Sequence, residues 1–278
     1  MALTPVNDYL GEPFIELQSV GSTNNYALDQ IHSNLAHPGT CYFAHDQTAG
    51  KGQRGKSWIT EKGANITMSL ITRPSFLQPF EQFYLSACIA GATHQFLNHH
   101  TGRELKIKWP NDLYWRNQKL GGILIENIIQ ADKKESKTGI KQKDEISSNS
   151  NWQWAVIGIG ININQTHFQD LLSNPVSLRQ ITGKSFDTIQ LAKDLCKTID
   201  VWYRQLTEEG RDPILKSYND ALYKVNEPVK FRKDNRNFIA VVKSVDRNGQ
   251  LIIQHSLEEK ISFGEVEWLV EKSPDTLP

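Results

Sequence analysis

The sequence lacks a surplus of either charge, since 31 Lys and Arg residues balance 31 Asp and Glu residues in 278 positions. A neutral chain lacks the broad positive field that draws proteins to phosphate backbones or anionic lipid, which argues against a dedicated nucleic-acid or membrane-surface protein. No apolar stretch approaches the roughly 20 residues that span a bilayer, and residues 1–17 have no secretory leader pattern. The sequence therefore predicts a cytoplasmic protein whose partner is neither a nucleic acid nor a membrane.

Cysteine and clustered metal ligands are also scarce. The three cysteines, Cys41, Cys88 and Cys196, are odd in number, far apart and set among apolar neighbours. This pattern predicts buried free thiols rather than disulfides or a metal site. The eight histidines show no metal-ligand spacing. Hydrophobic residues make up 38% of the chain, enough for a packed core.

Apolar periodicity indicates a mixed α/β domain followed by a small β domain. Helical spacing predicts helices over 24–31, 80–97, 191–206 and 212–222, with Ser22-Thr23 capping the first and Asp212-Pro213 opening the last. Short apolar runs predict strands at 41–44, 65–70, 105–108, 123–126 and 155–161. After residue 225, alternating runs with a turn at 246–249 predict a small β-barrel. Residues 131–151 hold only three apolar side chains, which predicts a mobile insertion in a hairpin.

Residues 50–57, GKGQRGKS, match the P-loop pattern letter for letter. A P-loop needs a helix that begins at Lys56, so that its first amides face the phosphates. Here Trp58 and a strand-like run follow instead, so we predict that the segment is not a P-loop. Its glycines and its cations Lys51, Arg54 and Lys56 favour an anion site, with a solvated hairpin tip as the alternative.

Residues 108–112, KWPND, follow a predicted strand that Pro110 ends. A carboxylate and an amide at this strand end, Asp112 and Asn111, can bind a nucleotide or a metal ion, and an ordinary turn after Pro110 is the alternative. Lys119 begins the next strand beside Gly121 and Gly122, which would let a ligand approach closely. A solvated edge charge is the alternative for Lys119.

Residues 158–164, GIGININ, are not a dinucleotide fingerprint, because the third glycine and a following helix are missing. Strand alternation puts Gly158, Gly160, Asn162 and Asn164 on one face. The glycines leave that face open, which predicts that a flat group lies against it.

In order and spacing, the segments 22–24, 47–58, 108–112 with Lys119, and 158–164 resemble the biotin protein ligases over the whole chain. The resemblance implies an α+β protein: a mixed-sheet catalytic domain of the biotin/lipoate ligase type over 1–224, followed by a small SH3-like β-barrel over 225–278. It also implies a two-step reaction. Biotin's carboxylate attacks the α-phosphate of ATP to give biotinoyl-5'-AMP and pyrophosphate, and a lysine of a biotin carboxyl carrier protein domain then takes the acyl group.

The resemblance implies three overlapping sets of site residues. The biotin-binding set is Ser22, Thr23, Asn24, Gln47, Gly50, Lys51, Gly52, Gln53, Lys119 and Gly122. The ATP-binding set is Arg54, Lys56, Trp58, Lys108, Trp109, Asn111, Asp112, Asn162 and Asn164, with Asp112 beside Mg²⁺. The implied catalytic residues are Lys119, Arg54 and Lys51. The implied substrates are ATP and biotin, and the protein would be a monomer or a homodimer.

The sequence departs from the family pattern in its Gly-rich loop and in the 131–151 insertion. The family usually carries Arg where Lys51 and Gln53 stand. Lys51 keeps the charge without the two-pronged guanidinium, and Gln53 has no charge, so we expect retention of the adenylate to be altered. About twenty residues precede Ser22, too few for the DNA-binding domain of bifunctional relatives, so a monofunctional enzyme is expected. A lipoate-type ligase on the same fold and a non-catalytic module that binds an anion and a protein remain the alternative functions.

Overall fold

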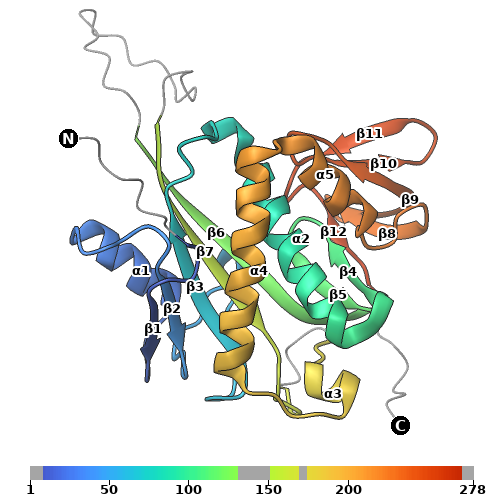
Figure 1. Ribbon diagram of the computed structural model, residues 1–278. Helices are drawn as coiled ribbons and strands as arrows, with labels where there is room; N and C mark the ends of the chain where they lie inside the picture. Colours follow the sequence, from blue (N-terminus) through green and yellow to red (C-terminus); the bar gives the residue numbers. More distant parts are fainter. Residues whose placement is uncertain (1–8, 131–150, 169–173, 271–278) are drawn as a thin grey trace, which may run out of the picture.

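The computed structural model describes residues 9–130, 151–168 and 174–270, which form two β-sheets with helices on the larger one (Figure 1). The strands of the larger sheet are β1 (Phe14–Leu17), β2 (Cys41–Ala44), β3 (Ile66–Thr72), β4 (Leu105–Lys108), β5 (Asp112–Trp115), β6 (Gln118–Gln130) and β7 (Asn151–Ile161). Their order is β1-β2-β3-β7-β6-β5-β4, with β1 and β2 parallel and the other neighbours antiparallel. The sheet is therefore mixed, as predicted.

Helices cover both faces of this sheet (Figure 1). The helices are α1 (Thr23–His32), α2 (Gln82–Thr101), α3 (Leu178–Thr182), α4 (Thr188–Glu208) and α5 (Arg211–Asp220), with 3₁₀ turns η1 (Gln53–Gly55), η2 (Pro79–Glu81) and η3 (Gly102–Glu104). On one face, α2 and α4 enclose the main core. On the other, Ala27 and Ile31 of α1 pack with Tyr42, Trp154 and Val156. All seven residues of β3 are buried because both faces are covered.

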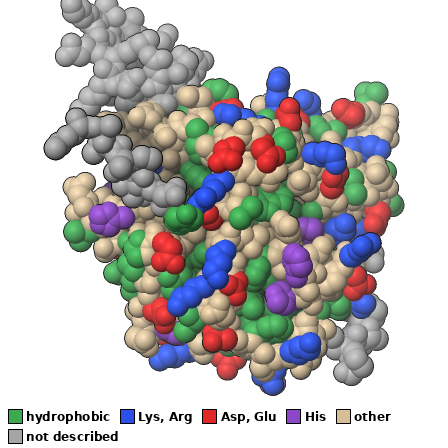
Figure 2. Space-filling model, in the orientation of Figure 1, with side chains coloured by type: hydrophobic (Ala, Val, Ile, Leu, Met, Phe, Trp, Pro, Cys, Tyr) green, Lys and Arg blue, Asp and Glu red, His purple; other side chains and the backbone are tan. Residues whose placement is uncertain are grey.

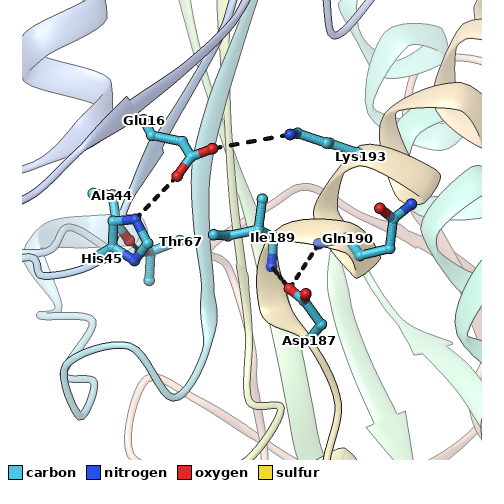
Figure 3. A network of polar contacts seen from close by, with 8 residues as sticks. All are labelled: Glu16, Ala44, His45, Thr67, Asp187, Ile189, Gln190 and Lys193. Atoms are coloured by element: carbon cyan, nitrogen blue, oxygen red, sulfur yellow. Dashed lines mark hydrogen bonds and ion pairs between the residues drawn. The ribbon is translucent and has the colours of Figure 1, made fainter.

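A polar network joins the edge of the sheet to the start of α4 (Figure 3). Glu16 of β1 lies 3.3 Å from His45 Nε2 and 3.9 Å from Lys193 Nζ of α4. Asp187 caps α4 by accepting hydrogen bonds of 3.0 Å from two backbone amides of its first turn. Exposed ion pairs of this kind contribute about 0–1 kcal/mol each, so they orient the sheet edge more than they stabilise it.

The smaller sheet has five antiparallel strands in the order β11-β10-β9-β8-β12. They are β8 (Pro228–Lys233), β9 (Arg236–Val245), β10 (Leu251–Gln254), β11 (Glu258–Ile261) and β12 (Glu267–Trp268). The predicted turn between β9 and β10 is confirmed, since Asp246 Oδ1 accepts hydrogen bonds from Asn248 N and Gln250 N at 2.9 and 3.0 Å. Gly249, with φ of +79°, closes this turn.

The turn at Gly249 also joins the two sheets. The Trp109 indole donates a 2.9 Å hydrogen bond to the Gly249 carbonyl, and the Trp109 ring packs edge-on against Phe263. A Cβ at Gly249 would come within 2.7 Å of the Phe83 ring of α2, so only glycine lets the turn approach this closely. The smaller sheet is therefore fixed against the larger one by Trp109, next to Pro110.

Several sequence predictions need correction. The helix predicted over 80–97 begins at Gln82, and Phe80 is exposed in η2. Gly210, not Asp212, is the N-cap of α5. Ser22 is at the N-cap of α1 but makes no side-chain cap bond. Strands β1 and β5 and helix α3 were not predicted, because each is too short to show a period.

Other predictions are confirmed or lie outside the described residues. Cys41, Cys88 and Cys196 are buried free thiols. The predicted insertion 131–151 lies outside the described residues, except that Asn151 is the first residue of β7. Within the described ranges no helix is long and apolar enough to cross a bilayer. Figure 2 shows basic and acidic side chains interspersed on one face, in keeping with the balanced composition.

Because α4 packs on the sheet through one apolar stripe, its two faces should differ in their sensitivity to truncation. Leu195→Ala, at a fully buried position, should lower the free energy of unfolding by about 2–5 kcal/mol. Val201→Ala, at an exposed position of the same helix, should change it by less than about 0.5 kcal/mol. Urea denaturation of both variants measures this, and equal losses would contradict the packing described.

Candidate functional site

A cavity of about 810 Å³ opens between the larger sheet, the Gly-rich hairpin at 50–58 and the segment 263–270 of the smaller sheet. Most residues implicated by the sequence line it. These are Ser22, Thr23, Asn24, Gln47, Lys51, Gly52, Gln53, Arg54, Lys56, Trp58, Lys108, Trp109, Asn111, Asp112, Lys119, Gly122 and Asn162. Four sequence segments that are far apart therefore meet at one place.

Two of the implicated residues do not line the cavity. The Asn164 side chain donates to the Phe186 carbonyl at 2.8 Å and accepts from the Phe186 amide at 3.0 Å. The alternation predicted through residue 164 fails because β7 ends at Ile161. Gly50 lies at the base of the hairpin, where a Cβ would come 2.3 Å from the Trp58 carbonyl. Gly50 thus lets the hairpin close, and Asn164 fixes the chain before α4.

The centre of the cavity is an ion pair between Lys119 Nζ and Asp112 Oδ1 at 2.7 Å. Lys119 and Gly122 are three residues apart, so a regular strand would place them on opposite faces. A β-bulge shifts the β5–β6 register between Leu113 and Tyr114 and turns Lys119 to the face of Asp112 and Gly122. A Cβ on Gly122 would lie 3.1 Å from Asp112 Oδ1 and 3.3 Å from Lys119 Nζ, so glycine leaves both groups accessible from the cavity.

Further cations surround this pair. Lys108 ends β4 close by, and burial lowers the pKa of its ammonium to about 8, with Lys119 and Lys56 contributing and Asp112 acting in the opposite direction. Lys51 lies 4.0 Å from Glu126 Oε1 on β6. The concentration of positive charge suits the cavity to a ligand with carboxylate or phosphate groups.

The Gly-rich hairpin is not a P-loop. Lys56 has extended backbone angles, φ −70° and ψ 146°, so no helix begins there. The hairpin is closed by hydrogen bonds from Gly52 N to Lys56 O at 2.7 Å and from Trp58 N to Gly50 O at 2.8 Å. At its tip Arg54 has φ of +55°. Its guanidinium lies next to Gly264, where an added Cβ would be in van der Waals contact with it. The predicted exclusion of a P-loop is confirmed, and the tip reaches the smaller sheet.

A second part of the cavity carries neutral hydrogen-bonding groups. Gln47 Oε1 accepts hydrogen bonds from Thr23 N at 2.8 Å and Thr23 Oγ1 at 3.1 Å. Ser69 Oγ lies 2.7 Å from Thr23 Oγ1 and 2.6 Å from Asn24 Oδ1, and Asn24 Nδ2 donates to Glu126 Oε2 at 2.7 Å. The sequence does not predict that Ser69 and Glu126 belong to this network. For Ser69 a signal exists, because a serine in the middle of a fully buried strand needs a hydrogen-bond partner.

The open face predicted at the glycines of β7 is occupied. A Cβ on Gly158 would come 2.3 Å from Asn24 Oδ1, and one on Gly160 would come 2.4 Å from the Trp58 ring. The flat group predicted to lie on this face is thus the indole of Trp58. Its Nε1 is buried and has no hydrogen-bond partner among the described residues.

Two asparagines of the cavity wall use their amides to fix backbone. Asn111 Nδ2 donates to the Ile123 carbonyl, and Asn162 Nδ2 donates to the Val176 carbonyl at 3.1 Å. The backbone of Lys119 is held in turn by Asn174 O and Val176 N at 2.8 and 3.0 Å. These bonds make the floor of the cavity rigid around Lys119.

The smaller sheet contributes wall residues that the sequence did not reveal, among them Phe263, Gly264, Glu267 and Trp268. No local pattern marks them, because their position depends on how the two sheets pack. They close the side of the cavity nearest Lys108.

Asp112 is the carboxylate that the sequence implies for a magnesium site. In the described ranges no group of three or more His, Cys, Asp or Glu residues could hold a metal ion. Asp112 uses Oδ1 for Lys119 and keeps Oδ2 outside that pair. One carboxylate oxygen fits the way Mg²⁺ binds at nucleotide sites, where phosphates and water supply most ligands.

The chain is similar to known biotin and lipoate ligases. A family model described as the biotin/lipoate A/B protein ligase family matches residues 16–143. The bifunctional ligase/repressor BirA of Escherichia coli is 28% identical over 86% of this chain and 68% of its own length. The biotin–[acetyl-CoA-carboxylase] ligase of Paracoccus denitrificans is 26% identical over 76% of this chain and 82% of its own.

Solved structures share the fold. A biotin protein ligase from Aquifex aeolicus, in complex with biotin and ATP, superposes with a TM-score of 0.72 at 21% identity, over 94% of this chain and all of the other. These structures show that the chain has the biotin protein ligase fold. Its residues 16–143 match the biotin/lipoate A/B protein ligase family, and the chain is similar to biotin ligases over most of its length.

The close contact between Gly160 and Trp58 predicts what holds the hairpin shut. Gly160→Ala should displace the indole and expose the hairpin, so trypsin should cut after Lys51, Arg54 or Lys56 several-fold faster than in the unchanged protein. Gly21→Ala, where a Cβ would meet nothing within 4 Å, is the matched control. Equal cleavage rates in both variants would show that Trp58 does not hold the hairpin.

Proposed function

We propose that this protein activates biotin with ATP to biotinoyl-5'-AMP and transfers the biotinoyl group to a lysine of a biotin carboxyl carrier protein domain. Both substrates of the first step carry anionic groups at the reacting atoms. Bringing a carboxylate and a triphosphate together requires fixed positive charge in a preorganised site. The cavity provides this charge beside a region of neutral hydrogen-bonding groups.

The Lys119–Asp112 ion pair carries the proposal. The Lys119 side chain is partly exposed at the floor of the cavity, between the neutral region around Thr23 and the cationic region around Lys108. An ammonium at this boundary can contact an incoming carboxylate and an α-phosphate oxygen at once, and it would stabilise the charge that develops as they react. The bulge that aims Lys119 into the cavity leaves it no other role in the core.

The remaining roles follow from this orientation. Ser22, Thr23, Asn24 and Gln47 would bind the ureido ring of biotin, whose donors and acceptors match hydroxyls and amides. Lys51, Gly52, Gln53 and Gly122 would complete the biotin side, and Arg54, Lys56, Trp58, Lys108, Trp109, Asn111, Asp112 and Asn162 the ATP side. Asp112 would contribute one oxygen to Mg²⁺, which would screen the phosphates. The hairpin at 50–58 would exclude water from the adenylate.

The domain division belongs to the same proposal. Residues 1–224 would form the catalytic domain, and the five-stranded sheet of 225–278 would be an SH3-like barrel. Trp109 and Gly249 support close docking of the barrel on the catalytic domain. The carrier domain would then approach the cavity from outside both.

Removal of the central ammonium should strongly slow the first step. Lys119→Ala should lower the rate of biotin-dependent exchange of pyrophosphate into ATP by about a hundred- to a thousandfold, the size of one lost electrostatic contact in such a site. Lys243→Ala, an exposed lysine of β9, is the control and should exchange normally. Normal exchange in the Lys119 variant would rule out the assigned role.

The acid that is activated can be tested in the same assay. Biotin should support exchange and lipoate should not, because the neutral region around Thr23 and Gln47 offers hydrogen-bonding groups that suit a ureido ring. Titrating lipoate against a fixed concentration of biotin measures the preference. Exchange that lipoate supports better than biotin would assign the chain to the lipoate side of the family.

Gln53 gives a prediction about the intermediate. Gln53→Arg adds a charged donor to the hairpin beside the cavity, so it should slow release of biotinoyl-AMP from the protein. Single-turnover reactions with labelled biotin, followed by rapid filtration, measure the release rate. Gln190→Arg, on the exposed side of α4, is the control, and an unchanged release rate in the Gln53 variant would contradict the expectation.

A further inference from the structure

Lys108 is a partly buried ammonium, and among the described residues it has no counter-charge at pairing distance. No carboxylate oxygen in the described ranges forms an ion pair with its Nζ within 4.0 Å, and Asp112 is paired with Lys119 instead. Its contacts are instead with aromatic faces: Nζ lies 4.9 Å from the ring centroid of Tyr114 and 5.6 Å from that of Trp268. An aromatic face attracts the ammonium without neutralising it, so the charge of Lys108 stays available to a ligand.

Trp268 comes from the smaller sheet, whereas Lys108 and Tyr114 belong to the larger one. Strand β12 holds Trp268 opposite Phe231 of β8, with the two rings 4.9 Å apart and edge to face. Its ring also lies 6.1 Å from that of Tyr223, which in turn packs on Tyr114 at 5.5 Å. The indole is therefore fixed by aromatic packing on both sides of the sheet boundary.

The charges around Lys108 favour an anion. Lys56 and Lys119 face it from the hairpin and from β6, and Asp112 and Glu267 face it from β5 and β12. Since Asp112 is occupied by Lys119, the group has a positive excess where it meets the cavity. A desolvated and unneutralised cation binds an anion more strongly than a hydrated one, because less water must be removed.

We propose that Trp268 is a positioning residue for phosphate binding: its ring shields the Lys108 ammonium from water without neutralising it, so that the smaller sheet strengthens the hold on the phosphates of the nucleotide. The inference rests on the proposed function for the identity of that nucleotide. Trp268 acts through Lys108 and need not touch the reacting atoms. The smaller sheet is then part of the phosphate site and not only a neighbour of it.

The test is a double-mutant cycle on binding of inorganic pyrophosphate, measured by calorimetry. Trp268→Leu, which keeps apolar bulk but removes the aromatic face, should weaken binding about tenfold, the size expected for loss of a desolvated cation–π contact. Trp268→Phe should restore most of the affinity. In a Lys108→Met background, Trp268→Leu should add less than about twofold, since residues that act as a unit are not additive.

The same variants separate positioning from structure. In pyrophosphate exchange, Trp268→Leu should raise KM for ATP about tenfold and leave kcat nearly unchanged. The control is Trp154→Leu, which removes the indole under Arg73, on the face of the sheet covered by α1, and should alter neither affinity nor KM. Thermal unfolding confirms that each variant folds, and Trp268→Met replaces the Leu variant if that one does not.

Two results would overturn the inference: a full tenfold loss in the Lys108→Met background, or equal losses for Trp268→Phe and Trp268→Leu. Failure of the proposed function looks different. In that case the protein exchanges no pyrophosphate with biotin present, while the binding cycle still shows coupling between Trp268 and Lys108. That result would support the phosphate site and rule out the biotin reaction.

Discussion

The ion pair between Lys119 and Asp112 is the interaction around which the site is built. It exists because a bulge in β6 brings Lys119 to the same face of the sheet as Asp112, and because Gly122 leaves room beside both side chains. The backbone of Lys119 is fixed by Asn174 and Val176, and Asp112 begins a strand two residues after Pro110. A flexible, strongly hydrated lysine is thereby held at one position before any substrate arrives.

Both sheets contribute residues that surround this ion pair. The larger sheet supplies the floor, and the neutral groups of Thr23 and Gln47 line the cavity beside it, with Ser69 hydrogen-bonded behind Thr23. The smaller sheet supplies a wall, which Trp109 fixes by its hydrogen bond to Gly249. Between them the Gly-rich hairpin lies over Gly160 through Trp58 and reaches the smaller sheet at Gly264. Separate elements thus enclose a charged region that water would otherwise screen.

The sequence predicts most of this arrangement, and its failures have physical causes. Strand 41–44 is predicted to the residue because four consecutive apolar positions are buried on both faces of the sheet. The cations of the hairpin and the Lys-Trp-Pro-Asn-Asp segment are recognisable because glycine and proline leave clear local signals. By contrast, Asn164 was wrongly extrapolated from the alternation of β7, which ends three residues earlier. The bulge between β5 and β6 depends on strand pairing, and the position of Trp268 in the cavity wall depends on packing between distant segments. No local sequence pattern encodes either of them.

Mass spectrometry of the intact protein under native conditions, after incubation with biotin, ATP and Mg²⁺, tests the central claim most directly. We expect a bound species with the mass of biotinoyl-5'-AMP, which forms about a hundred- to a thousandfold more slowly in Lys119→Ala. The species should disappear when a carrier domain is added and gains the biotinoyl group. Protein that carries only unreacted biotin or ATP, or nothing at all, would contradict the claim.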